Sequence, residues 1–363
     1  MTTLPLIDSD ECSLQHFGDM SRRHEIPIED ILLIAINIHG INSDQPRHRA
    51  RIAVRLATAP SVPWNVIVPL NASHSPFTLD GDQLSLGHQS IGNVQRVDAD
   101  EAVGGYFRDN GHAATLNPNA RSRCTGCAFC PNTLEAAADP RLREEARISE
   151  LLEAMREQHP ARDLTKLREV TVSTGCFERE PEALRHLLQL RKILTAHSIT
   201  ARIGFLTSVL RSDDAFRELA TSVSPFVLRL TIECLTRRDL LLKASKASLA
   251  RAEMADLLIR ARKAGLETSF TYIVGLDPIS DLRTGILQLA PGVSAFPNFQ
   301  VYQAHNSIMA GLRAPDADSV EFFLRARREI ERVFWSTGLR PQAWEGYRSL
   351  WYFTFADENL VSR

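Results

Sequence analysis

The chain has little excess charge and no long apolar run. Its 363 residues carry a formal net charge of −2, which creates no field for gathering nucleic acid or an anionic membrane surface. No apolar stretch reaches the roughly 18 residues that a membrane-spanning helix needs. The acidic start, MTTLPLIDSDEC, has no positive flank before an apolar segment, unlike a secretory signal peptide. We therefore expect a cytoplasmic protein without nucleic-acid or membrane partners.

Cysteines are also few, but they are unevenly placed. Of the 6 cysteines, Cys12, Cys176 and Cys234 are scattered along the chain. The other three, Cys124, Cys127 and Cys130, form one short cluster. A disulfide framework is typical of short secreted chains, so this distribution does not favour one. In a cytoplasmic protein of this length, clustered cysteines favour metal binding or catalysis.

Residues 1–110 are predicted to form an N-terminal β-rich accessory module. The segment Ile31–His39 is apolar and β-branched, Ala50–Leu56 alternates between apolar and polar residues, and Trp64–Leu70 is a short apolar run. Each of these patterns is typical of a strand, and turn-forming residues separate them.

Residues 111–336 alternate between short apolar strands and amphipathic helices, which predicts six βα units. The fold class is therefore α/β, a partial (β/α)6 TIM-like barrel whose chemistry lies at the carboxyl ends of the strands. The expected strands are His112–Leu116, Glu169–Ser173, Ala201–Leu206, Val227–Ile232, Thr268–Val274 and Phe299–Tyr302. The expected helices are Pro140–Gln158, Glu180–Ala196, Asp213–Ala220, Ser248–Ala264, Asp281–Leu289 and Ala317–Ser336. Residues 337–363 are predicted to be a short aromatic extension that packs on the barrel.

The cysteine cluster reads Cys124-Thr-Gly-Cys127-Ala-Phe-Cys130-Pro. Three thiolates with this spacing can converge on one face of an iron–sulfur cluster and leave one iron open. A mononuclear zinc site usually has four ligands in two pairs, and no second pair is present. A bacterial ferredoxin run would place a fourth cysteine where Leu134 stands. A zinc knuckle or simple buried thiols remain the alternatives.

With Phe129 before the third cysteine and Pro131-Asn132 after it, this loop resembles that of the radical S-adenosylmethionine (SAM) superfamily. The family motif is usually C-x3-C-x2-C on the loop after the first barrel strand, whereas this chain has C-x2-C-x2-C. The resemblance covers about Gly111 to Ser336. It implies a [4Fe–4S] cluster held by the three cysteines, with SAM as the second cofactor.

The resemblance also implies roles for residues at the other strand ends. The family's G-G-E-like turn is matched in part by Gly175 and Glu178, and its S-x-E strand end by Thr231-Ile-Glu233. Six residues are thereby assigned to cofactor binding: Gly175, Glu178, Arg229, Glu233, Val274 and Tyr302. Arg229 or Lys243 is the alternative partner of the Glu233 carboxylate, and core packing is the alternative role of Val274.

His305, at the end of the sixth strand, and Cys176 are the candidate catalytic residues. A structural role is the alternative for this histidine, and a small core residue is the alternative for this cysteine.

The implied reaction is reductive cleavage of SAM, which starts radical chemistry on a small-molecule substrate of specialised metabolism. An electron donor such as flavodoxin or ferredoxin is the implied partner. The short cysteine spacing leaves 3-amino-3-carboxypropyl transfer from SAM as an alternative reaction. The alternative from another class is a zinc-stabilised binding protein, whose fourth ligand would be a residue such as His112 or Cys176.

Overall fold

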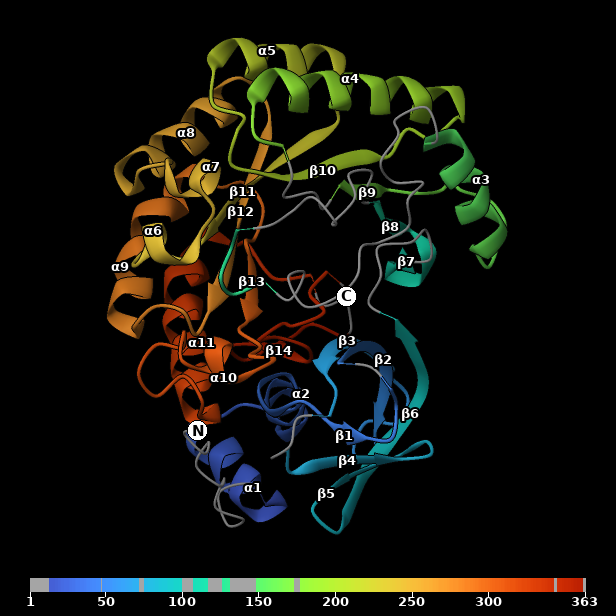
Figure 1. Cartoon of the computed structure of the whole chain (residues 1–363), viewed down its shortest axis with the longest axis vertical. Coiled ribbons are helices and arrows are strands. Elements are labelled where there is room, and N and C mark those ends of the chain that lie inside the picture. The colour runs from blue at the N-terminus through green and yellow to red at the C-terminus, as the bar shows by residue number, and fades with distance from the viewer. Residues whose placement is uncertain are drawn as a thin grey trace. The chain divides into compact units, whose positions relative to one another are not determined.

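The computed structural model describes residues 13–46, 48–71, 75–99, 107–116, 126–130, 148–172, 177–342 and 345–361. The chain forms two compact units, traced by colour in Figure 1. The first unit comprises Met1–Asp100, Ile273–Thr284 and Asn298–Arg363, and the second comprises Glu101–Tyr272 and Gly285–Pro297. Both units are discontinuous along the chain. Within the described ranges, every helix is too short or too polar to cross a membrane.

The N-terminal part of the first unit contains two helices and a six-stranded sheet with the order β1-β4-β5-β6-β2-β3. All neighbouring pairs are antiparallel except β1 and β4. The elements are α1 (Leu14–His24), α2 (Ile28–His39), β1 (Asn42–Ser43), β2 (Arg49–Leu56), β3 (Trp64–Pro69), β4 (Phe77–Asp80), β5 (Gln83–Leu86) and β6 (Gln89–Ala99). The strands predicted at 50–56 and 64–70 are confirmed.

The strand predicted at Ile31–His39 is wrong, because this segment belongs to helix α2. Glu29 and Asp30 lie in the first turn, where carboxylates stabilise a helix, and Gly40 ends the helix with a φ of +68°. Every side chain from Asp30 to Ile38 is buried. A helix that is apolar on all sides shows no amphipathic period in its sequence. Its run of β-branched residues therefore has the same pattern as a buried strand.

The C-terminal part of the first unit adds one strand, two helices and a small hairpin. These elements are β13 (Asn298–Val301), α10 (Ser307–Ala310), α11 (Val320–Phe334), η7 (Trp335–Thr337), β14 (Thr354–Phe355) and β15 (Glu358–Asn359). Helix α11 begins at a Ser319 cap, whose Oγ accepts from the Phe322 N–H, and it packs against α2. The aromatic tail belongs to the same unit, where Trp351 contacts Phe299 and Phe355.

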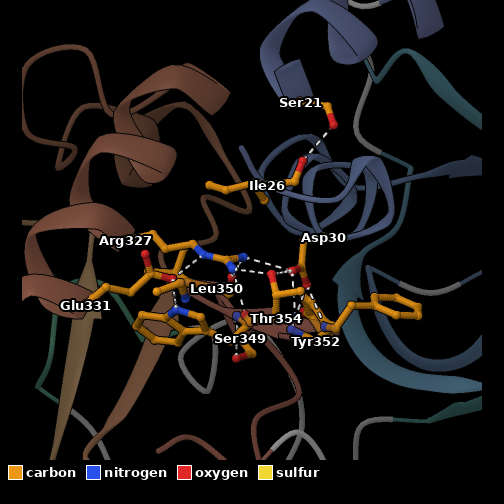
Figure 2. A network of polar contacts seen from close by, with 12 residues as sticks. Ser21, Ile26, Asp30, Arg327, Glu331, Ser349, Leu350, Tyr352 and Thr354 are labelled. Carbon is orange, nitrogen blue, oxygen red and sulfur yellow. Dashed lines mark hydrogen bonds and ion pairs between the residues drawn. The ribbon is translucent and has the colours of Figure 1, made fainter. Parts of the chain in front are cut away.

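A largely buried polar network joins this tail to α2 and α11, as Figure 2 shows. The Arg327 guanidinium contacts Asp30 Oδ2 at 2.9 Å and Glu331 Oε1 at 2.8 Å. Asp30 Oδ1 also accepts from the Tyr352 N–H at 2.7 Å, and Trp351 Nε1 donates to Glu331 at 2.8 Å. Burial alone would lower the pKa of Arg327, but the two carboxylates raise it and keep the guanidinium charged.

The second unit alternates between strands and helices as the sequence predicted. Its strands are neighbours in the order β12-β11-β10-β9-β8-β7; β8 to β12 are parallel, and β7 is antiparallel to β8. The elements are β7 (Phe107–Arg108), η1 (Asp109–Gly111), β8 (Ala113–Leu116), α3 (Ile148–Gln158), β9 (Glu169–Val172), α4 (Glu180–Ala196), β10 (Arg202–Thr207), α5 (Asp213–Ser222), β11 (Phe226–Glu233), α6 (Arg238–Leu241), α7 (Ala244–Ala247), α8 (Arg251–Lys263), β12 (Glu267–Val274), α9 (Ile279–Leu289) and η6 (Ala290–Gly292).

These strands form a curled sheet, and helices α3, α4, α5 and α8 run along its outer side in Figure 1. Strand β12 and helix α9 each contribute residues to both units. The architecture is mixed α/β with a curled parallel sheet, in agreement with the coarse prediction of a partial barrel. The carboxyl ends of its strands meet at one edge, where parallel α/β sheets usually bind ligands.

Candidate functional site

Two of the three clustered cysteines lie in a tight turn of the second unit. The Cys130 N–H donates to the Cys127 carbonyl at 3.1 Å, which closes the turn. The Ala128 N–H donates to the Leu241 carbonyl at 2.9 Å, and the Lys243 N–H points at Cys127 Sγ at 3.5 Å. The turn is therefore fixed against the end of helix α6.

The chemistry of this turn fits an iron–sulfur cluster. Cluster-binding sulfurs commonly accept hydrogen bonds from backbone N–H groups, and the Lys243 N–H is placed to donate one to Cys127. Burial raises the pKa of the Cys127 thiol, while the nearby Lys246 ammonium acts in the opposite direction. Cys124 lies outside the described residues, and among those described no three His, Cys, Asp or Glu side chains form a metal site.

Glu233 lies at the end of β11, close to this turn. Its backbone is left-handed, with a φ of +66°, and the pairing of β11 with β12 shifts register between Thr231 and Glu233. A bulge of this kind redirects a side chain at a strand end and is common beside active sites. The Glu233 carboxylate contacts Lys246 Nζ at 2.7 Å, and both side chains are largely buried.

The partner of Glu233 is thus Lys246 of helix α7, whereas the sequence suggested Arg229 or Lys243. Lys243 instead contacts Glu178 at 2.6 Å. Partial burial alone would raise the pKa of Glu178, but the hydrogen bond from Lys243 and its positive charge lower it. Lys243 therefore pairs with Glu178, and Lys246 pairs with Glu233. The sequence predicted both of these carboxylates to bind a cofactor.

Arg229 lies further down the same strand, in a buried ion-pair network. Its Nη1 contacts Glu169 Oε1 at 2.8 Å, and Arg202 contacts the other oxygen of Glu169 at 2.6 Å. Burial alone would raise the pKa of Glu169, but the two nearby guanidinium groups of Arg229 and Arg108 help to hold it well below its usual range. Gly204 leaves room for this contact, because a Cβ there would lie 2.3 Å from Arg229 Nη1.

Two threonines lie near Glu233 in the sheet, Thr231 on the same strand and Thr271 on the neighbouring strand β12. Thr231 and Thr271 stand opposite one another in the register of β11 and β12. Their hydroxyl oxygens are buried, and neither has a hydrogen-bond partner in the described part of the chain. A buried hydroxyl without a partner is costly, so this pair fits a ligand with hydrogen-bonding groups.

The three predicted residues Val274, Tyr302 and His305 belong to the first unit. Val274 is fully buried, and its carbonyl accepts from the Tyr302 N–H at 2.9 Å. The buried Tyr302 hydroxyl donates to the Met309 carbonyl at 2.8 Å, which anchors the ring. Gly275 lies beside it with a φ of +111°, where a Cβ would come 3.0 Å from Tyr302 Cβ. His305 is half-buried beyond the end of β13.

Comparisons with known proteins gave distant structural similarities, two of which are described below. No protein-family model matches the chain, and no curated protein matches it. The structure of Streptococcus suis SuiB bound to S-adenosylmethionine is similar with a TM-score of 0.40 and 11% identity, over 56% of this chain and 43% of SuiB. The structure of TsrM from Kitasatospora setae, a radical S-adenosylmethionine methyltransferase with cobalamin and a [4Fe–4S] cluster bound, is similar with a TM-score of 0.33 and 12% identity, over 48% of this chain and 34% of TsrM. The matched part spans less than half of either protein.

The structure adds Lys246, Thr231 and Thr271 to the candidate site, and three predicted residues lie outside the residues that it describes. Lys246 was not singled out from the sequence, although it follows Lys243 at helical spacing in the segment after β11. Cys124, Gly175 and Cys176 lie outside the described residues. The described residues do bring Cys127, Cys130, Glu178 and Glu233 to the two lysines of the segment 243–246.

Proposed function

We propose that this chain is a radical SAM enzyme acting on a small-molecule substrate. The observation that carries the proposal is the common environment of Cys127 and Glu233. The Cys127 sulfur accepts from the Lys243 backbone, and Lys246, three residues later, pairs with Glu233. The cysteine turn and the Glu233 carboxylate thereby both contact the short segment 243–246.

In this proposal Cys124, Cys127 and Cys130 hold the [4Fe–4S] cluster. The cluster would supply one electron for cleavage of a carbon–sulfur bond of SAM, and the electron would come from a donor such as flavodoxin or ferredoxin. The buried Cys127 and Phe129 side chains exclude water on one side of the turn. The Lys243 N–H and the Lys246 ammonium offset the negative charge of the sulfur ligands.

Glu233 and the two threonine hydroxyls are proposed to bind SAM. The Glu233 carboxylate, which pairs with the Lys246 ammonium, would accept from an amino or hydroxyl group. Thr231 and Thr271 supply two further groups that lack protein partners among the described residues. Gly175, Glu178, Arg229, Val274 and Tyr302 remain proposed cofactor-binding residues, and His305 and Cys176 remain proposed catalytic residues.

Anaerobic reconstitution with iron and sulfide tests the proposal. We expect the dithionite-reduced protein to show a [4Fe–4S] EPR signal that changes when SAM is added. The signal is expected to disappear in Cys127→Ala and to persist in Cys12→Ala, a matched removal of a cysteine outside the loop. Stoichiometric zinc without a cluster or SAM cleavage would contradict the proposal and favour a zinc-stabilised binding protein.

Mass spectrometry of the SAM products identifies the bond that is cleaved. 5′-Deoxyadenosine is expected if SAM cleavage starts radical chemistry on substrate. 5′-Methylthioadenosine together with a 3-amino-3-carboxypropyl product would instead assign the alternative transfer reaction. Product analysis with Cys127→Ala provides the background of SAM breakdown that does not depend on the cluster.

A further inference from the structure

A cavity of about 230 Å³ lies between helices α8 and α9 of the second unit. All of its lining residues belong to that unit. Its base is apolar and buried, and consists of Leu235, which follows β11, Met254 of α8 and Leu289 of α9. The cavity opens to solvent, since Ala252 and Gln288 line it and are exposed.

Small residues keep this cavity from being filled by the protein itself. Gly285 of α9 is buried against Leu235, and a Cβ there would lie 2.3 Å from Leu235 Cδ1. Ala252 and Ala255 line the cavity from α8 and extend only one carbon into it. Because an apolar cavity of about 150 Å³ can hold benzene, this one has room for a molecule of roughly nine non-hydrogen atoms.

The rim of the cavity carries a positive charge. Arg251 lines the cavity and is half-buried, and its side chain makes no hydrogen bond or ion pair with the described residues. The acidic side chains of the same part of α8 have other partners: Glu253 accepts from the Ala250 N–H at 3.3 Å, and Asp256 pairs with Arg260 at 2.8 Å. The Arg251 guanidinium is therefore available to an anion at the rim.

Two further groups at the rim favour a negative charge. Arg251 and Ala252 are the first two residues of α8, so their N–H groups have no acceptor within the helix. The positive end of the helix dipole lies at the same place. Gln288 supplies an amide donor from α9. An apolar base below a rim of donors matches a molecule with an apolar body and a carboxylate.

We propose that this cavity binds a small apolar carboxylate of about the size of benzoate. The apolar body would occupy the base, and the carboxylate would bind the Arg251 guanidinium, whose parallel donors match its two oxygens. A stable protein interface needs about 800 Å² from each partner, mostly around an apolar centre. Among the described residues of α8 and α9, Leu287 is the only large apolar side chain that is exposed, which favours a small molecule over a protein partner.

The proposed site requires neither an iron–sulfur cluster nor SAM, so its test is independent of the proposed function. NMR of the full-length protein with ¹³C-labelled methionine methyl groups provides the test. The Met254 resonance is assigned by its loss in Met254→Leu and is then followed during titration with benzoate. Met155 of α3 does not line the cavity, and its resonance should stay unchanged.

Three probes separate the contributions of the apolar body and the charge. Benzoate should produce a saturable shift of Met254. Acetate has the carboxylate without the apolar body and should produce none at the same concentrations. Benzamide has nearly the same shape without the charge, and should bind about tenfold or more weakly, because hydrogen bonds to a charged group are lost.

Three variants locate the binding site. Arg251→Gln should weaken benzoate by about fivefold or more and remove the preference over benzamide. Arg325→Gln, which removes an exposed arginine of α11, should leave binding unchanged. Ala252→Leu adds a larger side chain at an exposed position of the lining and should weaken benzoate and benzamide alike.

No saturable response of Met254 to benzoate, or equal affinities for benzoate and benzamide, would overturn the proposal. Benzoate binding in Arg251→Gln as tight as that of the wild type would also overturn it. A shift of Met254 on dilution without a probe would assign the cavity to a second copy of the chain, against the proposal. Circular dichroism establishes that each variant is folded, and the comparison of benzoate with benzamide needs no variant.

Discussion

Arg327 and Asp30 form an ion pair at 2.9 Å in which both side chains have no solvent exposure. The pair joins α11 to α2, and Figure 2 shows that Glu331 and the backbone of the C-terminal tail complete its coordination. Every oxygen of Asp30 is thus engaged by a donor. Removing one partner leaves a buried charge with no compensation, whereas the intact network is fully satisfied.

We therefore expect Arg327→Met to lower the free energy of unfolding by about 3–5 kcal/mol. The methionine fills part of the arginine volume but leaves the Asp30 and Glu331 carboxylates without their cation. Urea unfolding measures the loss. The control is Arg332→Met on the same helix, whose side chain is 63% exposed and whose pair with Glu329 should contribute less than about 1 kcal/mol. Equal effects of the two substitutions would refute a special role of the buried pair.

The second prediction concerns Gly126, which precedes the cysteine turn. Its φ is +103°, and a Cβ there would lie 3.0 Å from Lys243 Cβ. Gly126→Ala should therefore displace the turn and reduce the iron and sulfide bound after reconstitution. Gly265→Ala is the matched control, since Gly265 has a φ of +94° but nothing within 4 Å of its Cβ position. Iron content at the wild-type level in Gly126→Ala would show that the turn tolerates the added carbon.

The third prediction concerns Glu233 as a ligand of SAM. Glu233→Gln should raise the dissociation constant of SAM by about tenfold or more, because the hydrogen bonds of a charged acceptor are lost. Equilibrium dialysis of the reconstituted protein measures this constant. Glu157→Gln, at an exposed position of α3, should bind SAM as the wild type does. An unchanged constant in Glu233→Gln would remove this residue from the SAM site.

The fourth prediction is a loss of stability in acid that depends on His39. Its pKa is about 4 in the folded chain and 6.5 in the unfolded chain, so the unfolded state takes up the proton first as the pH falls. Stability should therefore decrease between pH 6.5 and pH 4, with His39 contributing up to about 3 kcal/mol. Urea unfolding of the wild type and His39→Gln across this range isolates that contribution. Parallel pH profiles of the two proteins would argue against it.

Much of the second unit could be predicted from the sequence, because its helices have one apolar face and its strands are short. The predicted helix at 180–196 agrees with α4, and the strands predicted at 201–206, 227–232 and 268–274 lie within one or two residues of β10, β11 and β12. Helix α2 could not be recognised from its apolar pattern, since burial on all sides removes the polar residues that mark a helical period.

The candidate site was only partly predictable, for a different physical reason. Cysteine spacing identifies Cys127 and Cys130, because ligands in one loop are close in the sequence. The ion-pair partner of Glu233 depends on where the short helices α6 and α7 lie after β11. Sequence spacing does not determine their position. Lys246 and Lys243 are both near in sequence, yet only the folded backbone decides that Lys246 reaches Glu233.

The ion pair between Asp30 and Arg327 joins residues that are 297 positions apart, and this separation has a consequence for biosynthesis. On the ribosome, the isoleucine-rich helix α2 emerges well before the helix and tail that cover it. The nascent chain must therefore carry this apolar segment uncovered while the intervening residues are synthesised. The second unit ends at Pro297 and can fold before helix α11 is made, whereas the first unit can close only after α11 and the tail have emerged.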